Sequence, residues 1–329
     1  MKRGWIGLTV LLMAVGCSRN DTIDPGPWNS YRNPVEQSDM QDPAICKADG
    51  KFFLFTSGSA DSVIPIMESS NLTNWSMTVT VFSDETKPTF ISGVTPTSPD
   101  IAKVGDRYLL YYSMYKSAAA SGIGVAESDL ATGPFTDKGK LLLGSDYGIS
   151  GAVSPSFFND GSDNYLVFGN FGGIYLIKLS ADGLSVAAGA SPVKLASEHF
   201  DAPYIMQKEG KFYLFASVGT AAGGADSPCQ QVVARADNVT GPYLDRDSRP
   251  MTDDGCEVLI KGSTKFAGPG HGCIFTSDDG SDWILYNAYD MSDLTKGRTL
   301  MLDHIIWDEG WPSVRGAIGS FCADAPVLN

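Results

Sequence analysis

Short apolar, aromatic-rich runs alternate with small polar turns along most of this chain. The clearest repeat is a glycine-containing turn followed by an aromatic strand-like segment, and it occurs five times: DGKFFLFTSG from Asp49, GDRYLLYYSM from Gly105, GSDNYLVFGN from Gly161, EGKFYLFASV from Glu209 and GSDWILYNAY from Gly280. The turn glycines lie between 49 and 70 residues apart. Strands joined by tight turns at this spacing are typical of β-propeller blades.

A second repeated element precedes each of these turns. A polar residue beside proline or glycine leads into a short apolar run, and the five copies are QDPAI at Gln41, SPDIA at Ser98, SPSFF at Ser154, DAPYI at Asp201 and HGCIF at His271. A single hairpin cannot bury both of its faces, so the copies must pack around a common axis. The sequence therefore predicts an all-β fold, a five-bladed β-propeller, over residues 39–329.

Composition agrees with this fold and narrows the function. Of the 329 residues, 43% are hydrophobic and only 19% are charged, and glycine is abundant at 36. These values, with turn signals every few residues, favour an all-β protein. The formal net charge of -14 argues against nucleic acid as a partner, because few cations are present to displace the counterions of a phosphate backbone.

The first 17 residues read as an export signal. Lys2 and Arg3 form a basic start, residues 5–15 are apolar but too short to span a bilayer comfortably, and Cys17 follows small residues as at a bacterial lipoprotein cleavage site. We expect Cys17 to carry lipid and the Pro-rich residues 18–38 to form a tether. This predicts an exported lipoprotein, held in the outer membrane at the cell surface or in the periplasm. Ordinary secretion with cleavage nearby is the alternative.

Five cysteines remain once Cys17 is assigned to lipid, so at least one thiol has no partner within the chain. Export permits a disulfide, and Cys229 with Cys256 is the pair we expect, because both flank strands of the fourth blade. We expect most of the others to be buried free thiols. No Cys or His spacing indicates a zinc site.

The innermost strands of a propeller begin around one mouth of the central channel. The polar residues that open the five copies should meet there, and they are Asp42, Asp100, Ser154, Asp201 and His271. Carboxylates that share a dehydrated site have pKa values pushed apart, which suits general acid and base catalysis. The alternative is that Asp and Ser before proline only form turns.

These segments resemble glycoside hydrolase family 43, and within it the endo-arabinanase branch. The resemblance rests on QDP from Gln41, SPD from Ser98, DAP from Asp201 and GPGH ending at His271, together with the stretches TGPYLDRDSRPM, FAGPGHGCIFTSDDG and IIWDEGWP. It covers roughly residues 39–313. The resemblance implies a five-bladed propeller, and an inverting reaction on arabinofuranosides or xylosides of plant cell-wall polysaccharide that uses three acidic residues.

Position by position, the resemblance assigns Asp42 as the general base and Asp201 as the general acid. Ser154 stands where the family has an aspartate that tunes this acid, and Asp201 stands where it has a glutamate. Serine supplies no negative charge to raise the pKa of the acid, so we expect Asp201 to be ionised at neutral pH. Glu198, three residues upstream, or Asp100 could compensate.

The resemblance also suggests substrate and metal contacts. We expect Gln41, Asp100 and Phe171 to contact substrate, although the family often has histidine in place of Gln41 and arabinanases a tryptophan in the segment of Phe171. His271 corresponds to a histidine on the propeller axis that helps to hold calcium or its water. A calcium ion is therefore the one cofactor expected.

Two hypotheses follow from these residues. The first is an exported, monomeric glycoside hydrolase that acts on a plant polysaccharide or oligosaccharide. The second is a propeller that has lost turnover and serves as a surface glycan-binding lipoprotein. Asp42, Asp100, Asp201 and His271 favour the enzyme, whereas the changes at Ser154 and Asp201 favour the binding protein.

Overall fold

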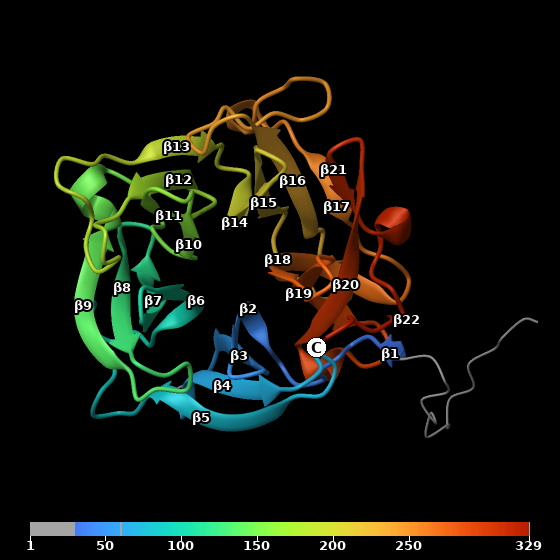
Figure 1. The fold of residues 1–329 in the computed structure, drawn as a ribbon, viewed down its shortest axis with the longest axis horizontal. Coiled ribbons are helices and arrows are strands. Elements are labelled where there is room, and N and C mark those ends of the chain that lie inside the picture. The colour runs from blue at the N-terminus through green and yellow to red at the C-terminus, as the bar shows by residue number, and fades with distance from the viewer. Residues whose placement is uncertain (1–29, 60, 329) are drawn as a thin grey trace, which may run out of the picture.

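The structure, a computed structural model, describes residues 30–59 and 61–328. Five four-stranded antiparallel sheets stand around a central axis like the blades of a propeller, as Figure 1 shows. The predicted fold class and number of blades are confirmed. The predicted signal peptide, the lipid-bearing Cys17 and the first part of the tether lie outside the described residues.

The chain builds the blades one after another, from the axis outward. In chain order the strands are β2 (Gln41–Ala48), β3 (Lys51–Ser57), β4 (Val63–Ser69) and β5 (Ser76–Phe82); β6 (Thr97–Val104), β7 (Arg107–Ser117), β8 (Ala120–Ser128) and β9 (Thr136–Leu143); β10 (Ser156–Asn159), β11 (Asn164–Asn170), β12 (Gly173–Lys178) and β13 (Val193–Ala196); β14 (Phe200–Lys208), β15 (Lys211–Val218), β16 (Gln230–Ala236) and β17 (Glu257–Ile260); β18 (Phe266–Thr276), β19 (Asp282–Asp290), β20 (Arg298–Asp308) and β21 (Trp311–Ser313). Short 3₁₀ helices lie between strands at η1 (Gly144–Tyr147), η2 (Gly224–Asp226), η3 (Met251–Asp253), η4 (Leu294–Lys296) and η5 (Arg315–Ala317).

The five repeated turns join the two inner strands of every blade. In blade 1, for example, Gly50 connects β2 to β3 with a φ of 74°, a conformation that glycine adopts at little cost. The aromatic runs that follow these turns pack between blades, as expected. Phe52 of blade 1 meets Phe275 of blade 5 edge-to-face at 4.9 Å, and Phe158 of blade 3 meets Phe212 of blade 4 at 5.9 Å.

The two ends of the described chain meet outside the blades, and their contact helps to close the ring (Figure 1). β1 (Ser30–Arg32) pairs with β22 (Cys322–Asp324) in a separate two-stranded sheet. Asn33 continues this contact: its Nδ2 donates to the Leu302 carbonyl at 2.8 Å, and its Oδ1 accepts from the Leu302 amide at 2.9 Å. The tether predicted to reach residue 38 is therefore too long, because residues 30–38 belong to the folded domain.

The predicted disulfide between Cys229 and Cys256 is wrong, and both are free thiols. Strand register explains the error. Val233 of β16 faces Glu257 of β17, so Cys256 lies beside Ala234, five residues along β16 from Cys229. Five residues of strand span roughly 16 Å, whereas bridged cysteines need Cα atoms within about 7 Å.

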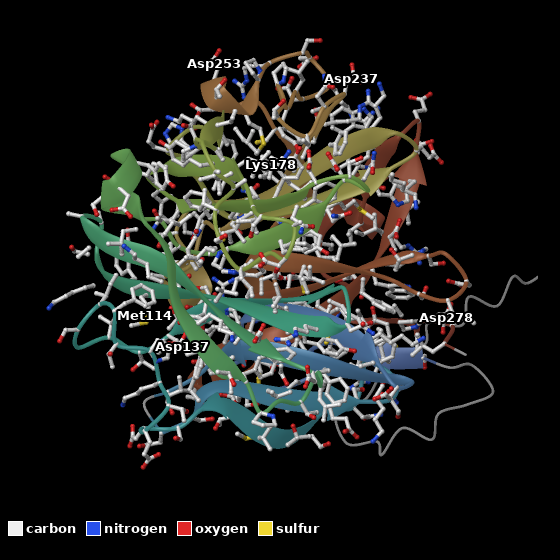
Figure 2. All side chains as sticks on the ribbon, turned by 60° about the vertical axis from the view of Figure 1, so that its left-hand side comes forward. Met114, Asp137, Lys178, Asp237, Asp253 and Asp278 are labelled. Atoms are coloured by element: carbon white, nitrogen blue, oxygen red, sulfur yellow. The ribbon has the colours of Figure 1, made fainter. Side chains whose placement is uncertain are left out.

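Some charged side chains lie on the outer surface. Asp237 and Asp253, for example, are exposed at the rim, where Figure 2 shows them. No helix in residues 30–59 and 61–328 is long and apolar enough to cross a membrane.

Candidate active site

Each innermost strand or its entry carries one non-glycine residue in the left-handed backbone region. These residues are Asp42, Ser98, Ser154, Ala202 and His271, with φ between 44° and 57°. The conformation is uncommon for such residues and turns the chain sharply at the channel mouth. The equal phase predicted from the sequence is thus partly wrong, since Asp201 lies one residue before this position and Asp100 two residues after it.

Side chains of the preceding blade fix four of these five turns. Ser57 Oγ accepts from the Ser98 amide at 2.8 Å, Ser113 Oγ from the Ser154 amide at 2.8 Å, Ser217 Oγ from the His271 amide at 2.7 Å, and Asn287 Oδ1 from the Asp42 amide at 2.9 Å. Gly169 of blade 3 has no side chain to do the same. The Ala202 amide donates instead to Oδ1 of Asp201 at 2.7 Å.

Asp42 is held as an ionised carboxylate. Its Oδ1 lies 2.9 Å from Nδ1 of His271, and its Oδ2 accepts from the hydroxyls of Ser57 at 2.5 Å and Ser98 at 2.9 Å. Burial alone would raise its pKa, but His271 and the two hydroxyls together hold the pKa of Asp42 well below its usual range. The Asp42 side chain remains 20% exposed, so water can reach a base that is already deprotonated.

Asp201 has the opposite tendency. Burial raises the pKa of Asp201, and the nearby Asp42 carboxylate raises it too, whereas His271, the Ala202 amide and Arg298 act against them. The pKa of Asp201 is therefore raised even without a carboxylate at position 154, and its ionisation at neutral pH stays a prediction. Burial supplies the upward shift that Ser154 cannot.

Ser154 is buried at this mouth, and its amide donates to Ser113. Glu198, suggested as a substitute acid, does not face the channel in this way. Its carboxylate pairs with Lys194, four residues earlier in the chain, and its side chain is 62% exposed. The structure thus brings Asp42, Asp201, Ser154 and His271 to one mouth and leaves Glu198 in an exposed ion pair with Lys194.

A cleft of about 530 Å³ opens beside Asp42 over blade 1. Gln41 and Thr97 line it, as do Ser57 and Ser62. The predicted contact Phe171 lies elsewhere around the mouth. It occupies the turn between β11 and β12 and is 45% exposed, so its ring is free to meet a long ligand.

Asp100 lies deeper, and the structure does not support its predicted role in binding substrate. Its carboxyl group is buried, and Oδ2 accepts from the Phe157 amide at 2.7 Å. Burial raises the pKa of Asp100 to about 7, while the Phe157 and Ile101 amides oppose the shift. Asp100 is a buried carboxyl between blades 2 and 3.

The side chains at the mouth do not fit a calcium site of their own. Calcium takes six to eight oxygen ligands, and the described residues contain no group of three or more His, Cys, Asp or Glu side chains that could hold a metal. His271 instead faces Asp42. The calcium ion stays a prediction, and no chemical step depends on it.

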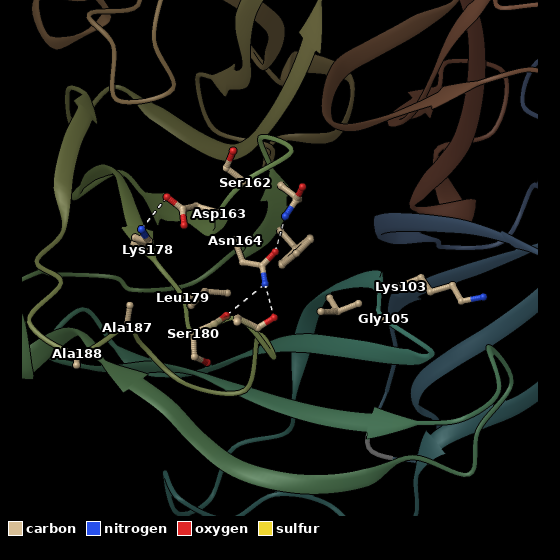
Figure 3. A pocket seen from close by; sticks show the side chains of 14 residues that line it. Lys103, Gly105, Ser162, Asp163, Asn164, Lys178, Leu179, Ser180, Ala187 and Ala188 are labelled. Atoms are coloured by element: carbon tan, nitrogen blue, oxygen red, sulfur yellow. Dashed lines mark hydrogen bonds and ion pairs between the residues drawn. The ribbon is translucent and has the colours of Figure 1, made fainter.

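A second cavity, of about 590 Å³, lies at the opposite end of blades 2 and 3 (Figure 3). It is lined by the end of β6 at Lys103 and by the β10–β11 turn. Asn164 closes part of it by donating to the carbonyls of Ser180 and Ala181, and Lys178 pairs with Asp163. These residues lie at the end of the inner strands away from Asp42, so this cavity is not the candidate active site.

Several residues at the mouth were not predicted from the sequence. Ser57, Ser98, Asn287 and Arg298 all act on Asp42 or Asp201 through the contacts above. A signal was present, because the aromatic segments of four blades carry Ser57, Ser113, Ser217 and Asn287 at the same position of the repeat. Their side chains link one blade to the next.

Comparisons with known proteins agree with this geometry. Residues 31–312 match the profile of "Glycosyl hydrolases family 43". The chain is 31% identical to the extracellular exo-α-(1→5)-L-arabinofuranosidase ArbA of Cellvibrio japonicus, over 85% of this chain and 87% of the relative. It is 26% identical to the extracellular endo-α-(1→5)-L-arabinanase 1 of Bacillus subtilis, over 83% and 87%. The structure of Cellvibrio cellulosa α-L-arabinanase complexed with arabinohexaose superposes with a TM-score of 0.76 at 29% identity, covering 87% of this chain and 99% of that one.

The matching profile and these relatives show that the chain is a glycoside hydrolase, and the two carboxyl groups at the mouth, one with a lowered and one with a raised pKa, agree with this class. The matching profile spans most of the domain. The chain belongs to glycosyl hydrolases family 43.

Proposed function

We propose that this protein hydrolyses arabinofuranosyl linkages of plant polysaccharide with inversion at the anomeric carbon. The observation that carries the proposal is the contrast between two carboxyl groups at one mouth. His271 and two hydroxyls lower the pKa of Asp42, whereas burial raises the pKa of Asp201. The names of two relatives, an exo-acting arabinofuranosidase and an endo-acting arabinanase, support the choice of sugar.

In this reaction Asp42 accepts a proton from the attacking water. Its Oδ2 is occupied by the Ser57 and Ser98 hydroxyls and its Oδ1 faces His271, so the carboxylate is fixed in orientation before water arrives. A fixed general base contributes about 10²–10⁴-fold to the rate. The water attacks the face of the sugar opposite the leaving group, which inverts the anomeric carbon.

Asp201 donates its proton to the oxygen of the departing sugar. Its side chain is one methylene shorter than the glutamate found in the family, and its Oδ1 accepts from the Ala202 amide. This hydrogen bond fixes one carboxyl oxygen and leaves the other to carry the proton. After transfer, His271 and Arg298 stabilise the resulting carboxylate, since both lower the pKa of Asp201.

The test is product release from arabinan and linear arabino-oligosaccharides by the wild type and by Asp42→Asn. We expect the wild type to release arabinose or short oligosaccharides with the inverted anomer seen first by NMR, and the variant to lose at least a hundredfold in rate. Asp106→Asn, in an exposed turn, is the matched control and should keep full activity. Binding without release by the wild type would replace this proposal with the surface glycan-binding function.

The proposal includes export and lipid anchoring through Cys17. The support is the basic, apolar and cysteine-containing N-terminal pattern, together with the word extracellular in the names of both relatives. The test is metabolic labelling with a palmitate analogue, followed by membrane fractionation. The wild type should carry label in the membrane fraction, and Cys17→Ala should carry none.

A further inference from the structure

One wall of the cleft beside Asp42 carries two side chains that the proposed chemistry does not use, Asp39 and Gln41. Nε2 of Gln41 lies 3.0 Å from Oδ2 and 3.3 Å from Oδ1 of Asp39. Carboxylate oxygens accept hydrogen bonds and an amide nitrogen donates them, so the nitrogen of Gln41, and not its oxygen, must face Asp39. The orientation of the Gln41 amide is therefore determined chemically.

Asp39 is itself fixed by blade 5. The backbone amide of Arg298 donates to its Oδ1 at 3.0 Å, and the Met40 amide donates to the Arg298 carbonyl at 2.9 Å. Gly297 approaches so closely that a Cβ at this position would lie 2.7 Å from Cγ of Asp39. These contacts leave Asp39 little room to move, and Gln41 is held in turn.

The orientation leaves Oε1 of Gln41 directed away from Asp39. Gln41 is exposed, and no hydrogen bond to this oxygen exists within residues 30–59 and 61–328. Ser62 lines the same cleft, but its Oγ is enclosed, so the Gln41 oxygen is an acceptor that this wall presents to a ligand rich in hydroxyl groups.

We infer that Gln41, positioned by Asp39, selects a sugar hydroxyl near the cleaved bond by accepting its hydrogen bond. The inference rests on the proposed hydrolysis of arabinofuranosyl linkages, because it names the groups that recognise sugar in that cleft. Gln41 acts as a specificity residue. Asp39 acts through Gln41 and is a positioning residue.

The decisive variant is Asp39→Asn, which keeps the shape and reverses the polarity. The Arg298 amide still requires an acceptor, so Oδ1 of the new side chain must face Arg298 and its Nδ2 must face Gln41. The shorter of the two Gln41–Asp39 hydrogen bonds, at 3.0 Å, is then replaced by two N–H groups that face each other, and we expect Gln41 to rotate its amide and offer Oε1 to the new donor. Its Nε2 turns into the cleft, where it can no longer accept from a hydroxyl.

The experiment compares kcat and KM of the wild type, Gln41→Met and Asp39→Asn on an aryl α-L-arabinofuranoside and on its singly deoxygenated analogues. In the wild type, one analogue should lose about threefold to tenfold in kcat/KM, the value of one hydrogen bond. Both variants should lose a similar factor on the parent sugar, mainly in KM, and nothing further on that analogue. Gln37→Met is the matched control, because this nearby exposed glutamine does not line the cleft.

An unchanged ratio of parent to deoxy analogue in Gln41→Met overturns the inference, even if overall activity falls. A change in Gln41→Met without one in Asp39→Asn overturns the positioning role alone. If the wild type turns over none of these sugars, the proposed function fails, and the same variants are then compared by calorimetric binding of arabino-oligosaccharide. Equal Kd values for wild type and Gln41→Met overturn the inference in that case.

Discussion

Nδ1 of His271 lies 2.9 Å from Oδ1 of Asp42, so a residue of the last blade holds the base supplied by the first. His271 lowers the pKa of Asp42, and Asp42 raises the pKa of His271, so each residue favours the charged form of the other. Burial disfavours the imidazolium, but the Asp42 carboxylate more than offsets it and raises the pKa of His271. The pair therefore joins the two ends of the ring through the catalytic group.

Replacing His271 should change the pH at which the base becomes protonated. His271 is the strongest of the groups that lower the pKa of Asp42. In His271→Gln, the upward effect of burial is opposed less strongly, so the pKa of Asp42 should rise. We expect the acidic limb of the kcat/KM profile to move to higher pH, with a larger loss at pH 5 than at pH 8. His304→Gln serves as control, because His304 is on an outer strand beside Trp283. An unmoved acidic limb in His271→Gln would contradict this role.

Removing the acid should matter most where the leaving group needs a proton. Asp201→Asn cannot donate the proton, and we expect a loss of about 10²–10⁴-fold on arabino-oligosaccharides. A dinitrophenyl arabinofuranoside, whose leaving group departs without protonation, should be hydrolysed nearly as fast as by the wild type. The measurement is the ratio of the two rates in both proteins. Equal losses on both substrates would show that Asp201 is not the acid.

Asp100 should make stability depend on pH. Its pKa is about 7 in the folded protein, whereas a carboxyl group in the unfolded chain titrates near 4. The folded state then binds the proton more tightly, so this contribution is fully present below about pH 4 and is lost as the pH rises to about 7. Asp100→Asn lacks the titration and should be more stable than the wild type at pH 8. Urea unfolding of the wild type, Asp100→Asn and the control Asp106→Asn at pH 5 and pH 8 measures the difference. An equal change in the free energy of unfolding between the two pH values in all three proteins would exclude this role for Asp100.

The blades were predictable because their signals are local. A turn glycine such as Gly105 and the aromatic strand after it specify one hairpin, and five copies specify the ring. Asp42, Asp201 and His271 were also placed at one mouth correctly, because inner strands of a propeller begin together. Each of these signals lies within a short segment, so it can be identified without knowledge of the tertiary structure.

The exact phase of the acidic residues was not predictable, because four of the five inner strands, β2, β6, β14 and β18, have a shift in register near their start. Between Gln41 and Ala44, and again between Asp201 and Tyr204, the pairing slips where the chain adopts the left-handed turn. Spacing in sequence does not report such a bulge. The upward shift in the pKa of Asp201 was missed for another reason, since burial by distant segments, and not position 154, raises this pKa.

Gly169 shows why the hydrogen bonding of Asp201 differs from that of the other blades. A side chain at Gly169 would collide with the carbonyl oxygen of Gly173, and its φ of 133° excludes other residues without strain. Blade 3 thus cannot offer a hydroxyl to the Ala202 amide. The Asp201 carboxyl group accepts from this amide instead, which ties the acid to its own backbone.

Ring closure should depend on Asn33, because within residues 30–59 and 61–328 no strand is exchanged between the first and last blades. The side chain of Asn33 is buried, and it both donates to the Leu302 carbonyl and accepts from the Leu302 amide. Asn33→Ala leaves these two backbone groups without their partner and should lower the free energy of unfolding by about 2–4 kcal/mol. Gln37→Ala, at an exposed neighbouring position, should change it by less than about 0.5 kcal/mol. Denaturant unfolding of the three proteins measures both values. A loss in Asn33→Ala no larger than in the control would mean that the β1–β22 pair and the Asp42–Asn287 contact close the ring without it.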